Sequence, residues 1–193
     1  MNTSTYFWTL KHIVPYIRFS TYYPSLRGAK YQEGYALLKT GHIVLTNDSK
    51  KLTALLIPGI FAHAALCVRG SGDASHFEIA EMTHTDYTKS YFFDLCKEAD
   101  HVVIIECVDF DAKYARKVAK KCAEFEDAVY DVKFDFGVKA LYCSELVYQA
   151  DFEHRLDVNL EDLAGLGRDY ISPTGLYKAK NIRVVWDSDK SNF

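Results

Sequence analysis

Residues 62–82 read AHAALCVRGSGDASHFEIAEM, and this stretch decides the fold. Ala62–Val68 is a short run of small and apolar residues, which predicts a strand. The following RGSGD (69–73) is typical of a hairpin loop, and Phe77–Met82 predicts the returning strand. Two strands joined in this way pair side by side, so we expect a sheet that contains antiparallel neighbours.

Further strands and helices are predicted on both sides of this hairpin. Gly41–Thr46 and Asn181–Trp186 predict strands, and His101–Val108 (HVVIIECV) predicts an inner strand buried on both faces. Asp111 begins a helix, and a second helix begins near Cys143. The apolar face of the first helix carries Ala115, Val118, Ala119, Cys122 and Phe125. Consecutive strands with flanking helices favour an α+β fold over an alternating βα order.

Composition limits the classes of protein. A chain of 193 residues is long enough for one domain with a short extension. We expect an aromatic-rich N-terminal extension or helix over 1–37, interrupted at Pro15, and one domain over 38–193. Hydrophobic residues make up 49% and charged residues 25%, which excludes disorder for most of the chain. The net charge of -3 gives no indication of a nucleic-acid partner.

No integral membrane segment is expected. The longest nearly apolar stretch, Leu52–Val68, has 17 residues and is interrupted by Pro58, Gly59 and His63. The first residues lack a basic region followed by an apolar stretch, which favours a cytoplasmic location, although release by lysis or carriage by a phage stays possible. Five basic residues on the helix after Asp111 indicate a solvated face rather than a contact with an anionic membrane or polymer. They are Lys113, Arg116, Lys117, Lys120 and Lys121.

The cysteines indicate neither a metal site nor a dithiol redox site. The chain has five, at positions 67, 96, 107, 122 and 143, and no two form a CxxC pair. We therefore expect no metal and no cofactor. Cys67, Cys107 and Cys122 fall in apolar patterns, where a thiol acts as a small hydrophobic group. Free thiols also indicate a reducing compartment.

Cys143 differs, because it lies where a loop joins a helix in LYCSELVY (141–148). Unpaired N–H groups at a helix start favour thiolate over thiol, and the thiolate is the nucleophile. The alternative interpretation is a half-buried structural cysteine. His63 is the candidate base: it shares a strand face with Ala65 and Cys67, whose small side chains leave room for the imidazole to meet a helix packed on that face.

Glu81 is the candidate residue that orients the imidazole of His63. It lies in the apolar row of Phe77 and Ile79 on the returning strand, where an unpaired carboxylate would be costly. A carboxylate that accepts from one ring nitrogen leaves the other nitrogen free to act on the thiol. This is the arrangement of papain-like enzymes, but the order His, Glu, Cys reverses their order along the chain.

Several segments in this order resemble the circularly permuted NlpC-like cysteine hydrolases, the YiiX/YebB-like group, whose wider relatives include the lecithin:retinol acyltransferase-like enzymes. The resemblance spans about residues 38–186. The matching segments are Gly41–Leu45, Pro58–Gly59 with Ala62–Leu66, Ile79–Glu81, Tyr130–Asp131 with Tyr142–Val147, and Ser172–Pro173 with Leu176–Tyr177. His42 departs from the pattern, since the group usually has Asp there, and we interpret this change as structural.

The resemblance implies a permuted papain-like (NlpC-like) fold, with a mainly antiparallel sheet or partial barrel packed against helices. It implies a cysteine hydrolase with Cys143 as nucleophile and His63 as base, acting on an amide, ester or thioester of a peptide or acyl-type substrate. We expect the backbone N–H of Cys143 to donate to the oxyanion. The substrate would be a cell-wall peptide or a lipid-type acyl group.

Two alternatives stay open at this point. In the acyltransferase-like relatives the orienting residue is a second His, about thirteen residues after the first. His76 lies thirteen residues after His63, but on the opposite strand parity from Glu81. The motif Cys143–Val147 favours the YiiX-like branch. The protein could also be a catalytically silent binding or assembly module that keeps the fold. Nothing in the sequence gives the oligomeric state.

Overall fold

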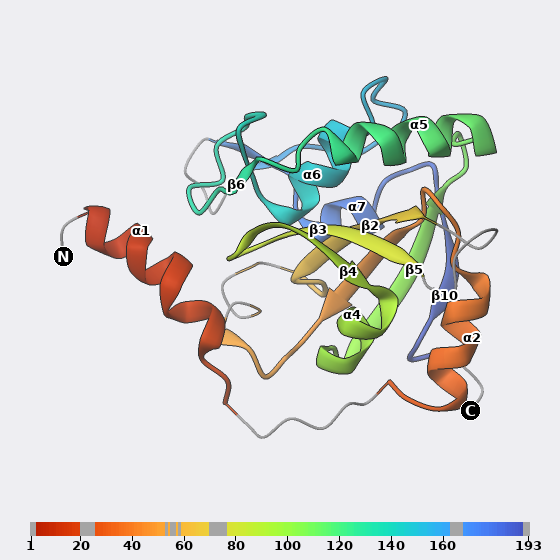
Figure 1. Cartoon of the computed structure of the whole chain (residues 1–193), viewed down its shortest axis with the longest axis horizontal. Coiled ribbons are helices and arrows are strands. Elements are labelled where there is room, and N and C mark those ends of the chain that lie inside the picture. Colours follow the sequence, from red (N-terminus) through yellow and green to blue (C-terminus); the bar gives the residue numbers. More distant parts are fainter. Residues whose placement is uncertain are drawn as a thin grey trace.

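A six-stranded sheet in the order β10-β5-β1-β2-β3-β4 forms the centre of the computed structural model (Figure 1). Every neighbouring pair in this sheet is antiparallel. Its strands are β1 (Ile43–Asn47), β2 (His63–Arg69), β3 (Glu78–Thr83), β4 (Asp86–Tyr91), β5 (His101–Cys107) and β10 (Ile182–Asp187). The structure describes residues 3–19, 26–52, 54, 57, 59–69, 77–162 and 168–190. The sheet and its helices confirm the predicted α+β class.

The hairpin that opened the sequence analysis is present as β2 and β3. Ala65 pairs with Glu81 and Cys67 with Ile79. Residues 70–76 of the connecting loop, and with them His76, lie outside the described residues, as does Pro58 of the predicted Pro-Gly turn. The run at 101–108 forms β5, an inner strand between β1 and β10, as its continuous apolar pattern predicts. The strand β4 and the helix after it had no signal that the sequence analysis used.

Helices cover both faces of the sheet. This is why apolar residues occur at both odd and even positions along its inner strands. One face packs against α5 (Ala112–Ala123) and α6 (Cys143–Ala150). The other face packs against α2 (Ala29–Leu37) and α4 (Phe92–Glu98). Figure 1 shows α5 and α6 above the sheet, and α2 and α4 below and beside it.

The helix α5 shows how the sequence specifies these elements. The Asp111 side chain accepts hydrogen bonds from the N–H groups of Lys113 and Tyr114 at 2.8 and 2.7 Å, so it caps the helix start. The five residues of the predicted apolar face are all buried. Of the five basic residues, four are exposed and Lys121 is half-buried, which fits the solvated face.

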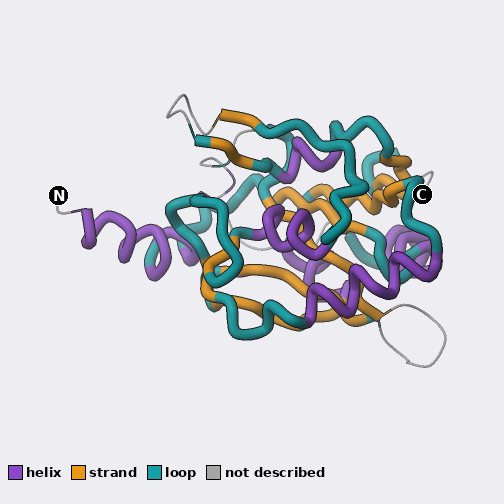
Figure 2. The backbone as a smooth tube through the Cα atoms, turned by 90° about the horizontal axis from the view of Figure 1, so that it is seen from above, coloured by secondary structure: helices purple, strands orange, loops and turns teal. Residues whose placement is uncertain are grey.

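The N-terminal segment lies apart from these layers. The helix α1 (Thr3–His12) contains no buried residue, and a short 3-10 helix, η1 (Val14–Tyr16), follows it. Figures 1 and 2 both show α1 projecting from one end of the molecule. No helix among the described residues is long and apolar enough to cross a membrane.

Short elements complete the structure around α6. They are β6 (Val129–Tyr130), β7 (Ala140–Leu141), β8 (Glu161–Asp162), β9 (Asp169–Tyr170) and α7 (Pro173–Tyr177). The parallel pair β6–β7 places Tyr130 beside Leu141, two residues before the start of α6. This pairing fixes the loop that leads into Cys143.

Candidate active site

His63 and Glu81 meet across the β2–β3 ladder. Since Ala65 is the direct partner of Glu81, His63 lies diagonally opposite that carboxylate on the same face. The ring Nε2 donates to Glu81 Oε2 at 2.7 Å. The other carboxylate oxygen accepts from the hydroxyl of Ser90, on the neighbouring strand β4. Both oxygens of this buried carboxylate are therefore satisfied, and the imidazole is held in one orientation.

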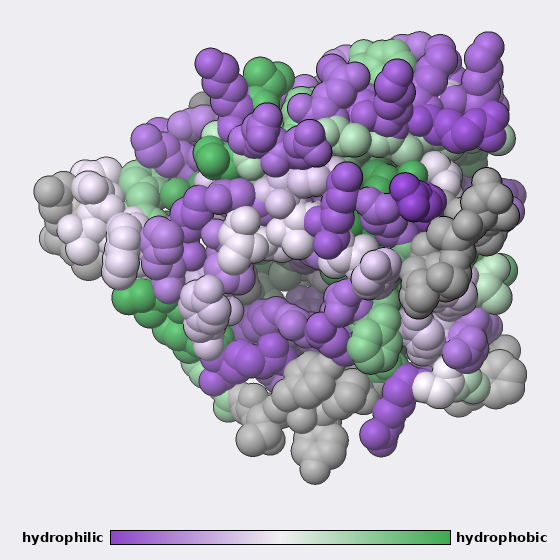
Figure 3. Space-filling model, viewed as in Figure 1, coloured by the Kyte–Doolittle hydropathy of each residue, from purple (hydrophilic) through white to green (hydrophobic). Residues whose placement is uncertain are grey.

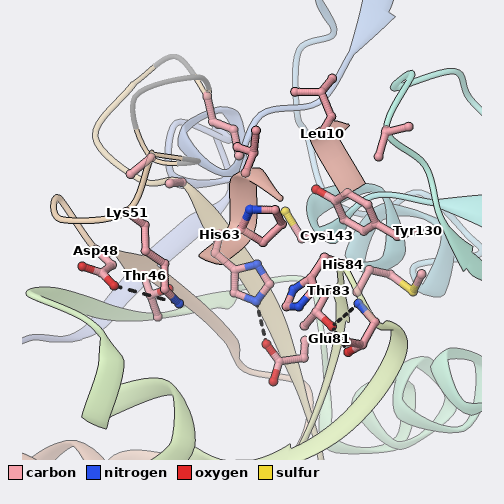
Figure 4. Close-up of a pocket in the computed structure, with 18 of the residues that line it drawn as sticks. Leu10, Thr46, Asp48, Lys51, His63, Glu81, Thr83, His84, Tyr130 and Cys143 are labelled. Carbon is pink, nitrogen blue, oxygen red and sulfur yellow. Dashed lines mark hydrogen bonds and ion pairs between the residues drawn. The ribbon is translucent and has the colours of Figure 1, made fainter. Parts of the chain in front are cut away.

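Cys143 is the first residue of α6, and its thiol lies close enough to the imidazole of His63 for the two groups to shift each other's pKa. Because Nε2 is engaged with Glu81, the nitrogen left for the sulfur is Nδ1. The nearby backbone N–H groups of Ala64 and Ser144 also favour the sulfur as an anion and so lower its pKa. Figure 4 shows His63 joined to Glu81 by a dashed line, with the sulfur of Cys143 nearby.

The helix that carries Cys143 packs on a different face from the one we expected. The side chains of Leu146 and Val147 join the cluster that contains Ala64 and Leu66. The face of Ala65 and Cys67 packs against the other cluster. The expectation that the helix covers the His63 face is wrong. Cys143 still reaches the imidazole, because the N-terminus of α6 lies at the beginning of β2, where His63 is the first residue.

The charges of the three groups favour a thiolate–imidazolium pair. Burial alone would lower the pKa of His63, but hydrogen bonds to Cys143 and Glu81 outweigh it and raise that pKa to about 10. Burial would raise the pKa of the Cys143 thiol, but the hydrogen bond and positive charge of His63 lower it. The same imidazole lowers the pKa of the buried Glu81 carboxyl. The carboxylate of Glu81, the imidazolium of His63 and the thiolate of Cys143 thus lie in one row with alternating charges.

The other thiols behave in the opposite way. Burial raises the pKa of Cys67 and Cys122 to about 12 and that of Cys107 to about 11, and it also raises the pKa of Cys96. These four side chains are neutral thiols at pH 7. Among the five cysteines, only Cys143 has the electrostatics of a nucleophile.

Neighbouring segments fix the start of α6. The Ser144 hydroxyl donates to the carbonyl of Ile171 at 2.6 Å, and the N–H of Ile171 donates to the hydroxyl of Tyr142 at 3.1 Å. Glu145 accepts from the N–H of Gly137 at 2.7 Å, and burial raises the pKa of Glu145 to about 7. As the first residue of the helix, Cys143 presents a backbone N–H that the helix itself leaves unpaired.

The site opens into a cavity of about 730 Å³. Cys143, His63 and Glu81 contribute to its wall, together with Tyr130 and Leu10. Figure 4 shows these five side chains around the cavity, and the surface is hollowed between the N-terminal helix and the sheet (Figure 3). The volume is in the range of sites that bury a small organic group.

Sequence reasoning missed two residues of this site. Ser90 holds Glu81, and its signal would have been recognition of β4 as a third strand of the meander. Tyr130 lies at the cavity wall, and the sequence analysis used it only as part of a resemblance. Among the described residues, no group of three or more His, Cys, Asp or Glu side chains is arranged to hold a metal ion.

The chain resembles a solved bacterial structure. The crystal structure of the metalloprotein YiiX from Escherichia coli O157:H7 superposes with a TM-score of 0.64 at 15% sequence identity, covering 77% of this chain and 96% of that one. At this identity the likeness shows a shared fold. No curated protein sequence matches the chain.

Residues 37–189 match the family described as "Permuted papain-like amidase enzyme, YaeF/YiiX, C92 family". The match covers the whole six-stranded sheet and α6, and it leaves out α1 and η1. The family resemblance and the permuted papain-like fold predicted from the sequence are confirmed. The chain therefore belongs to the permuted papain-like amidase family of YaeF and YiiX, and it is an enzyme of the cysteine peptidase and amidase type.

Proposed function

We propose that the protein hydrolyses an amide, ester or thioester with Cys143 as nucleophile, His63 as acid and base, and Glu81 as the positioning residue. The observation that carries this proposal is the row of Glu81, His63 and Cys143 at the wall of the cavity, in which His63 is hydrogen-bonded to Glu81 and lies beside the thiol. The hydrolase domain of the proposal is 38–193, with 1–37 as its N-terminal extension.

In the first half of the reaction, the Cys143 sulfur attacks the substrate carbonyl carbon. The electron pair of the C=O bond moves to oxygen, and the backbone N–H of Cys143 donates to this oxyanion. Imidazolium His63 then gives its proton to the leaving nitrogen, oxygen or sulfur. The C–leaving group bond breaks, and an acyl thioester on Cys143 is left.

In the second half, neutral His63 takes a proton from water, and the hydroxide attacks the thioester carbonyl. The acid leaves, and the thiolate–imidazolium pair is restored. Glu81 stays ionised throughout and keeps Nε2 of His63 protonated, so Nδ1 is the nitrogen that transfers protons. Ser90 keeps the carboxylate in place.

The test is a panel of small peptide, ester and thioester substrates with wild-type protein and Cys143→Ala. We expect turnover of at least one class that Cys143→Ala loses, and a mass increase on Cys143 equal to the acyl group when the reaction is stopped early. A wild-type protein whose Cys143 reacts with iodoacetamide but turns over nothing and forms no acyl adduct would instead indicate a silent binding module.

A further inference from the structure

Part of the wall around Cys143 comes from the N-terminal segment. Five of its apolar side chains line the cavity, spaced as one face of α1 that continues into η1. They are Tyr6, Phe7, Leu10, Val14 and Pro15. Leu10 is drawn beside the cavity in Figure 4, near Tyr130 and Cys143. α1 has no buried residue and Val14 of η1 is buried, but none of the five side chains belongs to either core cluster of the sheet.

Polar contacts hold this segment against the domain. Lys11 Nζ lies 2.6 Å from Asp86 Oδ1, the same oxygen that accepts the N–H of Tyr130 at 2.8 Å. The ammonium of Lys133 lies 5.5 Å from the ring centroid of Phe7. Tyr16 hydrogen-bonds to His84 at 3.0 Å and stacks on it edge to face. The segment is therefore attached at several points around the cavity rather than at its end alone.

Polar side chains also line the cavity. Thr46, Thr83 and Thr88 are among them, as are Lys51 and Glu98, which form an ion pair. A substrate bound across the thiol would therefore meet the hydrocarbon of the N-terminal segment together with hydroxyl and charged groups. This mixed lining suits an acyl compound with an apolar acyl group and a polar leaving group.

The apolar wall is an addition to the family domain. The family match begins at residue 37, so all five lining residues of the N-terminal segment lie outside it. The catalytic residues of the proposed reaction lie inside it. The part of the cavity that would distinguish substrates is therefore supplied by a segment that the family match does not include.

We propose that residues 6–15 form an acyl-binding wall, which makes the enzyme select substrates with an extended apolar acyl group. The inference rests on the proposed function for its chemistry, since the acyl group is the one transferred to Cys143. Each methylene that moves from water into an apolar site favours binding about fourfold. A chain of several methylenes along Phe7, Leu10 and Val14 therefore separates long from short acyl groups by one to two orders of magnitude.

Alkylation of Cys143 tests the wall without requiring turnover. The second-order rate constants of N-methyl- and N-octyl-iodoacetamide are measured on the full chain by mass spectrometry of the Cys143 peptide. We expect the octyl reagent to react at least about tenfold faster than the methyl reagent, after correction for their rates with glutathione. Equal corrected rates overturn the proposal.

The matched variants are Leu10→Asp and Trp8→Asp. The first puts a charge into the wall, whereas Trp8 is 56% exposed on the other side of α1, where it stacks on His12 at 5.1 Å. Leu10→Asp should lower the octyl-to-methyl ratio at least about fivefold, because a charge next to hydrocarbon opposes its burial. Trp8→Asp should leave both rate constants unchanged. An equal fall in both variants overturns the proposal, and thermal unfolding checks that both chains fold.

Hydrolysis separates a failure of this wall from a failure of the hydrolase. The p-nitrophenyl esters of acetic and octanoic acid are compared on wild-type protein and Cys143→Ala. If both esters are turned over with equal kcat/KM and this turnover depends on Cys143, the proposed hydrolase function stands and the proposed acyl-binding wall is refuted. If neither ester nor any substrate of the panel is turned over, the proposed hydrolase function is refuted. The ratio of octyl to methyl alkylation rates then still tests the proposed acyl-binding wall.

Discussion

Two histidine–glutamate pairs lie on the same sheet, and only one of them lies beside a thiol. His63 on β2 donates from Nε2 to Glu81 at 2.7 Å. His42, directly before β1, places its Nε2 3.4 Å from Glu106 on β5. Glu106 also pairs with Arg183. In residue types the two pairs are alike, and both histidines lie next to buried strands.

The difference lies at the second ring nitrogen. Nδ1 of His42 accepts from the N–H of Lys39 at 3.2 Å, so that nitrogen carries no proton, and burial lowers the pKa of His42 despite the nearby Glu106. Nδ1 of His63 faces the thiol of Cys143, which gains stability as an anion when the ring is protonated, and the pKa of His63 is raised. A His–carboxylate pair becomes a candidate catalytic pair only when its free nitrogen meets an acid that can be ionised.

The largest expected effect separates the two histidines. His63→Asn should lower kcat/KM by about ten-thousand-fold, because the thiol loses the group that ionises it and the leaving group loses its acid. His42→Asn should leave kcat/KM near wild type and lower the free energy of unfolding by about 1 kcal/mol, since it disrupts a buried hydrogen-bond network. Ester hydrolysis and urea unfolding measure these quantities. A similar loss of activity in both variants contradicts the comparison.

The two carboxylates should differ in the same direction. Glu81→Gln should lower kcat about hundredfold or more, because an amide oxygen no longer stabilises imidazolium and the tautomer is no longer fixed. Glu106→Gln should lower it little. His76→Ala, at the position that the acyltransferase-like relatives would use, should also have little effect. Strong loss in His76→Ala with little loss in Glu81→Gln would assign the orienting role to His76.

Glu81 could be predicted from the sequence because its evidence is local. Strand alternation places it on a face with Phe77 and Ile79, and a hairpin loop brings that face beside His63. Five strands of the sheet (β1, β2, β3, β5 and β10) and the helices at 112–123 and 143–150 were predictable for the same reason, since the pattern of each is contained within its own segment. The family resemblance then supplied the pairing of His63 with Cys143, which no local pattern contains.

The missed features depend on distant contacts. Which face of β2 receives α6 is decided by how both helix layers pack around the whole sheet, and the small residues at Ala64 and Ala65 are nearly equivalent. β4 reads DYTKSY, which is mostly polar and lies at an edge of the sheet, so it lacks an apolar signal. The placement of Leu10 over the cavity depends on the ion pair of Lys11 with Asp86, 75 residues away.

The pH dependence of alkylation should distinguish Cys143 from an ordinary thiol. The lowered pKa of Cys143 means that its thiolate persists as pH falls, until protonation of the sulfur ends the ion pair. From pH 8.5 to 6.0 the iodoacetamide rate of Cys143 should fall less than about tenfold, whereas a free thiol falls about hundredfold. On the basic side, kcat/KM should decline near pH 10, where His63 loses the proton needed by the leaving group. A Cys143 profile that follows glutathione contradicts the ion pair.

The smallest expected effect concerns Ser90. Ser90→Ala removes the donor to Glu81 Oε1, so the carboxylate is held by His63 alone and can rotate. We expect a fall in kcat of about fivefold with little change in KM, in line with the loss of one hydrogen bond to a charged group. Ser90→Thr, which keeps the hydroxyl, should restore most of the rate. Ser49→Ala, which removes a hydroxyl bonded to Asp100, is the control for loss of a serine elsewhere.

The separation of His63 and Cys143 along the chain also has a consequence for the order of folding. The two members of the pair are 80 positions apart, whereas β2 and β3 are neighbours in sequence. Contacts between distant segments require closure of a long loop. The entropy lost on closure rises with loop length, so these contacts form later than local ones. The imidazole–carboxylate pair can therefore form early within a hairpin, while the sulfur stays an ordinary thiol until α6 docks. The reactivity of Cys143 therefore reports on folding. Brief pulses of iodoacetamide during refolding would show when the thiolate appears, and this time marks the last long-range step of assembly.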